Sequence, residues 1–429
     1  MNLKINKNLA NKLENLDIFN PYILVILILA FVVIAIPILY FSDELPSPSF
    51  QLYIFILIGI LFFIFGLKFP NIIAKFSGRF KNKIDILKNI NKDKSFFSSN
   101  NFSKFKSLKI VKSFEYIVLA IVLAVMIIQI ANFIIIGGIP LLSGSLKINT
   151  PTRIWLFSYI FFIIGINILF SKYDRKIYYL ILIIGLGLFA LTGYRTTPIA
   201  ILLSVFITLY YSKNMKIRYQ ILFITIIPIL LIIIGFAAVQ AIEWQHWRLN
   251  PLELVSYRAG FTLNILDRAI PLAGSTHGEL FFNTLTGFFK PLIPSFSEYV
   301  DPRVLVGTVV TGKAHSITST IFGPAILDFG AVGMAVQMFL IGLILKLLHL
   351  VQKHFKWIAT AFYGIMLAQS IIWIETGPTD FVVWLFYLLG IITIIYYFYN
   401  LANGSEENLN DNANVNDDGR SDCNGDGGG

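Results

Sequence analysis

The sequence predicts an all-α polytopic integral membrane protein with about ten transmembrane helices and one long extracytoplasmic loop. Of its 429 residues, 56% are hydrophobic, and the mean hydropathy is +0.74. Apolar runs of about 17 or more residues recur along the chain, close to the length that crosses a bilayer as a helix. The single cysteine, Cys423, excludes an intrachain disulfide.

The apolar runs divide the chain into a short N-terminal segment (1–20), a transmembrane domain (21–400) and a tail (401–429). The first run lacks a small-residue cleavage pattern after it, so we expect an anchor helix rather than a removable signal. The tail is acidic and rich in Gly and Asn, which predicts disorder. The expected spans are roughly 21–41, 50–67, 114–136, 154–170, 177–193, 197–212, 219–241, 317–345, 357–374 and 380–399.

Basic residues in the loops predict the orientation, because such loops stay on the cytoplasmic side. The 68–113 loop carries about a dozen Lys and Arg against two acids, which places it inside. Alternation from there puts the other basic short loops and both termini in the cytoplasm, and the long 242–316 loop outside. The net charge of +10 is therefore a topology signal and does not indicate nucleic-acid binding.

The stretch "LFALTGYRTTPIAILLS" places Arg195 between two apolar runs. Gly193 suits a helix C-cap, Thr197 an N-cap and Pro198 the first helical residue, so we expect a hairpin tip at the outer membrane surface. An arginine beside a helix N-terminus is typical of an anion site. An arginine that extends to lipid headgroups explains the same position equally well.

The long loop supplies the other candidates for chemistry. His277 and His315 can exchange a proton near neutral pH, and Glu279 is the next candidate for a base. Guanidinium groups suit phosphate, although each loop arginine can equally belong to a salt bridge; the candidates are Arg248, Arg258 and Arg303. The chain has no HxxxH, HExxH or DxD pattern, so neither a metal site nor another cofactor is predicted.

The segment "STIFGPAILDFGAVG" (319–333) introduces a carboxylate into an apolar run. Gly323 and Pro324 are expected to break the helix near the outer face, with Asp328 one turn further inside. Gly330 and Gly333 would allow close approach of a neighbouring helix. A carboxylate at this depth should pair with an arginine or cap backbone groups, so a structural role and a substrate-binding role both stay open.

Four stretches, in this order, resemble the O-antigen polymerase or oligosaccharide repeat-unit polymerase family, including its archaeal branch. They are "GGIPLLSG" (137–144), "GYRTTP" (193–198), "DPRVLVG" with "VTG" (301–312), and "TSTIFGPAILDFGAVG" (318–333). The resemblance covers most of the membrane part and implies a C-type glycosyltransferase-like architecture. It implies transfer of a growing glycan from a polyprenyl diphosphate to a hydroxyl of the next lipid-linked repeat, at the outer face of the cell membrane.

In such a reaction the lipid diphosphate leaves, and arginines can meet its charge without a metal. Substrate contacts are then expected from Arg195, Arg248, Arg258, Arg303 and Asp328. The resemblance also admits a flippase and a chain-length regulator as partners. An O-antigen ligase, a lipid-linked oligosaccharide flippase, and a scaffold or sensor without chemistry are the alternatives.

Overall fold

The computed structural model describes residues 17–41, 45–76, 108–143, 146, 153–173, 175–213, 251–287, 301–380, 382 and 384–399. These residues form helices and connecting turns, and six of the helices are long and apolar enough to cross a membrane. The all-α polytopic fold expected from the sequence is confirmed. The helices are α2 (Ile23–Tyr40), α3 (Phe50–Phe76), α5 (Leu108–Ile136), η1 (Pro140–Leu142), α7 (Arg153–Lys172), α8 (Ile177–Ala190), α9 (Thr196–Ser212), α11 (Pro251–Ala269), η2 (Ile270–Leu272), α12 (Glu279–Thr286), α13 (Pro302–Thr311), α14 (Gly323–Phe355), α15 (Ile358–Thr376) and a helix over Trp384–Tyr399.

Every expected span that falls on described residues contains a helix; the 219–241 span, the 401–429 tail and most of the 1–20 segment lie outside them. Three spans differ clearly from the expected bounds, and one of them is α5, which begins at Leu108 instead of 114. α3 continues through Pro70 to Phe76, and α14 runs from Gly323 to Phe355 instead of over 317–345. Gly323 and Pro324 begin α14 and do not break it. The break lies at Gly330, whose φ of 67° and ψ of −159° are non-helical and suit a residue without a Cβ.

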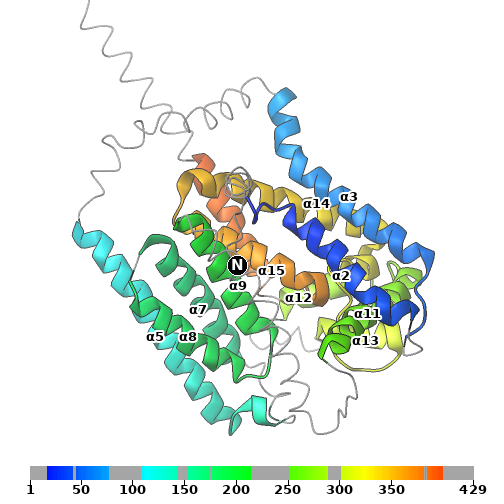
Figure 1. Ribbon diagram of the computed structural model, residues 1–429, viewed down its shortest axis with the longest axis horizontal. Helices are drawn as coiled ribbons and strands as arrows, with labels where there is room; N and C mark the ends of the chain where they lie inside the picture. The colour runs from blue at the N-terminus through cyan, green and yellow to red at the C-terminus, as the bar shows by residue number, and fades with distance from the viewer. Residues whose placement is uncertain are drawn as a thin grey trace, which may run out of the picture.

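The helices form two groups with α15 between them (Figure 1). α5, α7, α8 and α9 pack together on one side, and α3 packs along α14 on the other. α15 contacts α7 and α9 in the first group and α14 and α2 in the second. It is therefore the element through which the two groups meet.

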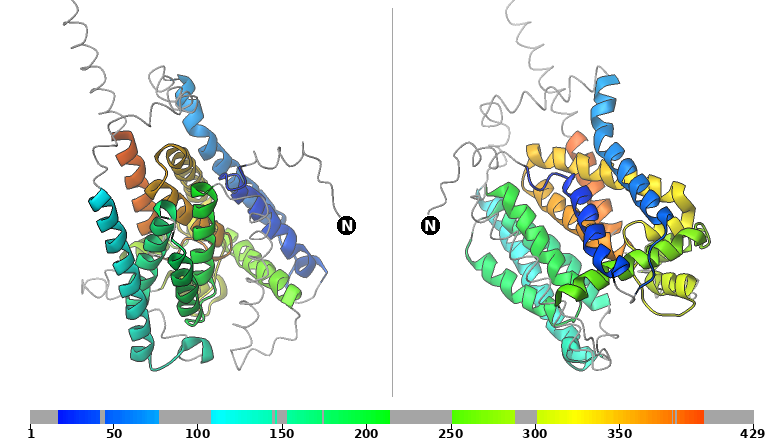
Figure 2. Two further views of the ribbon diagram at one scale, coloured as in Figure 1. Left: turned by 60° about the vertical axis from the view of Figure 1, so that its left-hand side comes forward. Right: turned by 45° about the vertical axis from the view of Figure 1, so that its right-hand side comes forward.

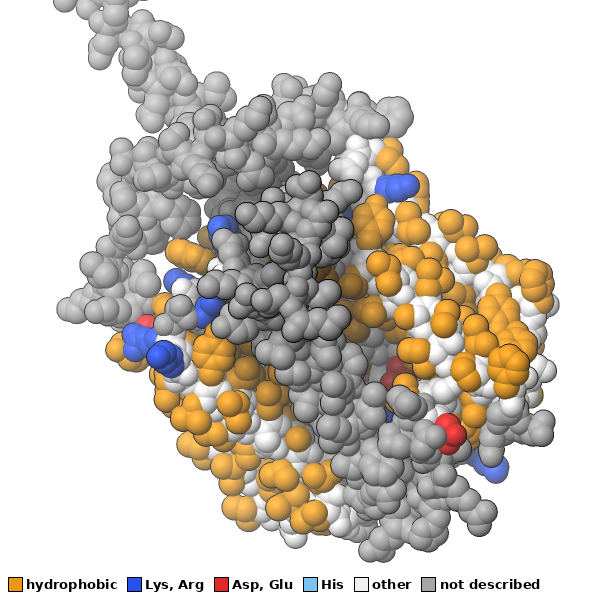
Figure 3. Space-filling model, viewed as in Figure 1, with side chains coloured by type: hydrophobic (Ala, Val, Ile, Leu, Met, Phe, Trp, Pro, Cys, Tyr) orange, Lys and Arg blue, Asp and Glu red, His pale blue; other side chains and the backbone are white. Residues whose placement is uncertain are grey.

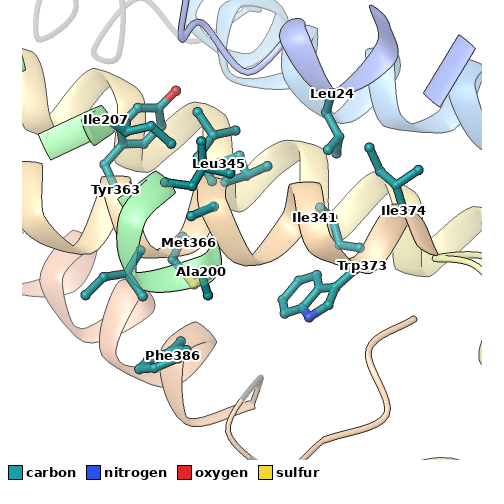
Figure 4. Close-up of a cluster of buried hydrophobic side chains, with 14 of the residues drawn as sticks. Leu24, Ala200, Ile207, Ile341, Leu345, Tyr363, Met366, Trp373, Ile374 and Phe386 are labelled. Carbon is teal, nitrogen blue, oxygen red and sulfur yellow. The ribbon is translucent and has the colours of Figure 1, made fainter. Parts of the chain in front are cut away.

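The hydrophobic core surrounds α15, as Figure 4 shows. Tyr363, Met366, Trp373 and Ile374 of α15 are buried among side chains from the neighbouring helices. Those neighbours include Leu24 of α2, Ala200 and Ile207 of α9, Ile341 and Leu345 of α14, and Phe386. Burial on every side holds α15 firmly along its length, so its final residue, Thr376, and the turn that follows have a defined position.

Close backbone approach joins α3 to α14. A Cβ on Gly66 would lie 2.2 Å from the carbonyl oxygen of Phe339, and a Cβ on Gly342 would lie 2.4 Å from that of Phe63. Small residues at such crossings let two transmembrane helices pack backbone to backbone. No larger residue fits either position without separating the helices.

The outer surface of the bundle is apolar, as expected for contact with lipid. Figure 3 shows hydrophobic side chains over both flanks of the described surface. Exposed large hydrophobic side chains come from several helices of the described residues and include Ile26, Val33, Leu57, Ile127, Ile183 and Ile395.

One end of the bundle, where α7 ends and α8 begins, is basic, and we call it the basic end. Asp17 ties the residues before α2 to this end: its carboxylate accepts hydrogen bonds from Tyr211 of α9 at 2.6 Å and from His349 of α14 at 3.0 Å. Lys353 adds an ion pair at 2.9 Å. A second ion pair, Arg175 with Glu115, joins the start of α8 to α5 at 2.7 Å.

The 242–316 loop was expected to be the main extracytoplasmic feature, too weakly apolar to span the membrane, and its described residues form the helices α11, η2, α12 and α13. α11 packs along α2, and α12 and α13 lie against one another beside the start of α14. Figures 1 and 2 show α11, α12 and α13 gathered beside the ends of α2 and α3. We call this side of the bundle, where α8 ends and α9 begins, the Arg195 end.

Candidate functional site

The turn between α8 and α9 places Arg195 at the start of α9. α8 ends at Ala190, the Thr192 hydroxyl accepts a hydrogen bond from the Tyr194 backbone N–H at 3.3 Å, and Arg195 is the N-cap of α9. The helix thus begins earlier than expected from Thr197 and Pro198, because the Arg195 carbonyl already accepts a bond from Ile199. The expected hairpin tip is present, and the side chain of Arg195 lies beside a helix N-terminus.

The helix that leads to this turn, α8, is too short to cross the whole bilayer. The 14 residues of α8 rise about 21 Å at 1.5 Å per residue, against a hydrocarbon core of about 30 Å. The "GGIPLLSG" stretch folds over the same turn, since Leu141 of η1 donates its N–H to the Leu191 carbonyl at 2.9 Å. The first quoted motif is therefore joined to the residue after α8, at the start of the turn that leads to Arg195.

Arg195 and Arg258 converge on one carboxylate oxygen. Arg195 donates from Nη2 to Glu375 Oε1 at 3.0 Å, and Arg258 of α11 donates from Nε to the same oxygen at 2.7 Å. The side chains of Arg195 and Glu375 are each 28% exposed, and that of Arg258 is 42% exposed. The three groups are thus half-enclosed and open on one side.

Among the described residues, two guanidinium groups against one carboxylate leave this cluster with an excess positive charge. Burial is the main influence on Arg195 and lowers the pKa of its guanidinium, while the Glu375 charge opposes that change. The guanidinium still carries its charge at neutral pH, because arginine is not deprotonated in proteins. Each arginine uses one nitrogen on Glu375, so the other donor nitrogens can face an anionic ligand.

The end of α15 and the turn that follows it, together residues 375–380, contact the other motifs. A Cβ on Gly377 would lie 2.7 Å from the Thr320 carbonyl oxygen, so this turn packs directly on the "TSTIF" backbone. Arg303 of the "DPRVLVG" stretch forms an ion pair with Asp380 and donates from Nε to Thr379 Oγ1 at 3.2 Å. Arg195, Arg258 and Arg303 therefore all bind carboxylates of this one six-residue stretch.

Asp328 caps backbone groups instead of pairing with an arginine. Its carboxylate accepts bonds from the N–H groups of Leu280 at 3.0 Å and Phe281 at 2.7 Å, and from the Thr276 hydroxyl at 2.5 Å. It thereby fixes the start of α12 on α14. The same turn carries His277, which has a positive φ of 50°, and Glu279, and both side chains are exposed.

The remaining sequence-predicted residues lie apart from the two arginines. His315 is exposed in the segment between α13 and α14, where its carbonyl group packs over Gly307. No hydrogen bond or ion pair recorded among the described residues joins the side chains of His277, Glu279 or His315 to Arg195 or Arg258. Arg248 lies outside the described residues.

Sequence reasoning missed Glu375 and Asp380. Both lie in "ETGPTD" (375–380), which runs from the end of the 357–374 span to the first residue of the 380–399 span, and alternation from the basic 68–113 loop puts this stretch on the same side as Arg195. The sequence did carry one signal for these acids: they lie close together on the side of the membrane that carries the four candidate arginines. The sequence did not show which arginine each acid contacts, because Glu375 is 180 residues from Arg195 along the chain.

The motifs gathered at this end agree with a comparison to known families. A model of the family described as "Putative O-antigen polymerase" matches residues 17–387. The chain belongs to this O-antigen polymerase family. Membership, together with the apolar helices, makes it a multi-pass membrane protein.

Two relatives come from Methanocaldococcus jannaschii, in accord with the archaeal branch of the O-antigen polymerase family. Uncharacterized protein MJ0419 is 28% identical over 232 residues, which cover 53% of this chain and 60% of the relative. Uncharacterized protein MJ0420 is 26% identical over 370 residues, which cover 80% of this chain and 85% of the relative. The chain thus spans less than two thirds of the first relative's length. No solved structure matches the chain.

Proposed function

We propose that this protein polymerises lipid-linked oligosaccharide repeat units into a surface polysaccharide. In each cycle the growing glycan moves from its polyprenyl diphosphate carrier to a hydroxyl of the next lipid-linked repeat. The reaction takes place at the outer face of the cytoplasmic membrane, and both termini of the chain are cytoplasmic. The Arg195 end of the bundle faces outward, because the basic end carries the residues that stay inside.

The observation that carries this proposal is the pair of arginines on Glu375. A departing diphosphate develops negative charge on the oxygen that it takes from the sugar, and pre-positioned cations stabilise that charge. Arg195 and Arg258 are held within hydrogen-bond distance of one shared oxygen, so both can contact one small anion. Their forked donors match phosphate oxygens in pairs, which a lysine cannot do.

Arg303 and Asp328 have supporting roles in this proposal. Arg303 holds the 375–380 stretch through Asp380 and Thr379. Asp328 holds the turn that carries His277 and Glu279. In the proposed reaction arginine side chains alone stabilise the charge on the leaving group, without a metal or another cofactor.

The glycans of a cell that lacks the gene test this function against its alternatives. Loss of a polymerase leaves single repeats attached to their final acceptor. Loss of a ligase leaves unattached lipid-linked polymer, and loss of a flippase leaves intermediates on the cytoplasmic face. Single attached repeats, restored to long chains by the intact gene, are the expected result; either of the other two patterns would contradict the proposal.

A further inference from the structure

Glu375 occupies the position in which a phosphate oxygen would bind. Its Oε1 receives both arginine bonds, at 3.0 and 2.7 Å. Among the described residues, no hydrogen bond is recorded to its other oxygen, Oε2, and the side chain is 28% exposed. The carboxylate thus holds the two arginines together while one of its oxygens still has room for another donor.

A phosphate competes with a carboxylate for the same guanidinium donors. A diphosphate offers more oxygens and more charge than Glu375 does, and arginine binds phosphate in a two-pronged geometry. When both arginines donate their hydrogen bonds to the diphosphate, Glu375 loses its own hydrogen bonds from Arg195 and Arg258. It then lies next to the diphosphate with its carboxylate ionised and available as an acceptor.

We propose that Glu375 is the catalytic base of the transfer, masked by Arg195 and Arg258 until a diphosphate binds. This inference rests on the proposed function. The acceptor hydroxyl donates its proton to Glu375 while its oxygen forms a bond with the anomeric carbon of the donor glycan. The bond between that carbon and the phosphate oxygen breaks, and the polyprenyl diphosphate leaves with the electron pair, neutralised by the two arginines. The proton later passes from Glu375 to water.

Position favours Glu375 over the bases expected from the sequence. The anomeric carbon is bonded directly to a phosphate oxygen, so the groups that hold that phosphate lie close to the reacting carbon. Glu375 already lies within 3.0 Å of both proposed phosphate ligands. His277, Glu279 and His315 are on exposed segments with no recorded contact to those arginines among the described residues. A masked base also explains how the site avoids activating hydroxyls before a donor is bound.

The test compares Glu375→Gln with the parent protein in two assays on the purified full chain. The amide oxygen of Gln can still accept the arginine bonds, but it cannot take a proton. We expect extension of lipid-linked repeats to fall about a hundredfold or more. We expect the affinity for farnesyl diphosphate, used as a probe, to stay the same or rise severalfold, because a neutral amide competes less for the arginines.

A purely structural Glu375 predicts a different pattern. If it only positions the arginines, farnesyl diphosphate binding and extension should fall together, and that result would overturn the proposal. Extension within about threefold of the parent would overturn it as well. Glu115→Gln is the matched control, because Glu115 also pairs with an arginine, but at the basic end. It should leave both assays unchanged.

A second variant covers the case in which Glu375→Gln does not accumulate. Glu375→Asp keeps a carboxylate on a shorter stem, so extension should persist at a reduced rate with a shifted acidic limb of its pH profile. An unchanged limb would overturn the base assignment. If the proposed function itself is wrong, the two arginines do not bind a diphosphate. Arg195→Ala and Arg258→Ala would then both bind farnesyl diphosphate as well as the parent does, independently of the results for the Glu375 variants.

Discussion

Replacement of Arg195 by lysine separates charge from geometry at the proposed diphosphate site. Lysine preserves the positive charge and can keep an ion pair with Glu375. It is a point donor, however, and lacks the planar fork that binds two phosphate oxygens together. We expect Arg195→Lys to be strongly impaired and Arg195→Ala to be nearly inactive.

The expected magnitude follows from the bonds that Arg195 makes. Its Nη2 is bound to Glu375 at 3.0 Å, and no other described residue is bonded to its other two nitrogens, which can face a ligand. Loss of one charge-assisted hydrogen bond costs about 1.5–3 kcal/mol. At about 1.4 kcal/mol per factor of ten, the rate should drop roughly ten- to a hundredfold if the contact tightens as the leaving group gains charge.

The assay is the glycan chain length in membranes that carry each variant at matched expression. Arg175→Lys is the control, because Arg175 also pairs with a glutamate but lies at the basic end. It should give chains of parental length. An Arg195→Lys protein that makes chains as long as the parent would refute the phosphate-clamp reasoning and leave Arg195 as an anchor at the lipid headgroups.

Three further predictions concern topology and stability. A reporter fused within residues 250–310 should be found outside the cell and one near Lys92 inside; a cytoplasmic 250–310 segment would overturn the outer-face chemistry. Gly342→Leu should cost about 1–3 kcal/mol or more of stability, because a Cβ there meets the Phe63 carbonyl at 2.4 Å. Gly187→Leu, where a Cβ meets nothing within 4 Å, should be tolerated, and equal melting of the two proteins would contradict the α3–α14 packing. At Asp17 burial acts to raise the pKa, but bonds from His349, Tyr211 and Lys353 outweigh it and lower the pKa. The stability that Asp17 adds is therefore present above its ordinary pKa of about 4 and lost as the pH falls further; the melting difference between the parent and Asp17→Asn should shrink below about pH 4, and a difference that grows there would contradict this assignment.

The membrane fold was predictable because hydropathy is a local property. Each apolar run of sufficient length had to form a helix, since an unpaired backbone is too costly in lipid. The turn at Arg195 was predictable for the same reason, from Gly193 and Pro198 between two runs. The helices of the 242–316 loop were not predicted, because their stability comes from packing on α2 and α14, as at Gly260 against Ile38.

The chemistry of the site was predictable only in part. Arginine suits a diphosphate wherever it occurs, so Arg195 and Arg258 could be proposed from residue type and side of the membrane alone. Their partner Glu375 could not, because the contact depends on the tertiary packing that brings the end of α15 to Arg195 and Arg258. The break in α14 at Gly330 was likewise misplaced to Gly323 and Pro324, since proline at the first turn of a helix is compatible with helical geometry.

Reconstitution of the purified chain with a defined lipid-linked oligosaccharide tests the central claim most directly. The glycan products are resolved by length, and the released polyprenyl diphosphate is counted against the glycosidic bonds formed. We predict a ladder of lengthening lipid-linked chains, with one polyprenyl diphosphate released for each new linkage, and no ladder with Arg195→Ala. Movement of the lipid-linked oligosaccharide across the bilayer without any new linkage, or its transfer to another acceptor without lengthening, would contradict the polymerase account.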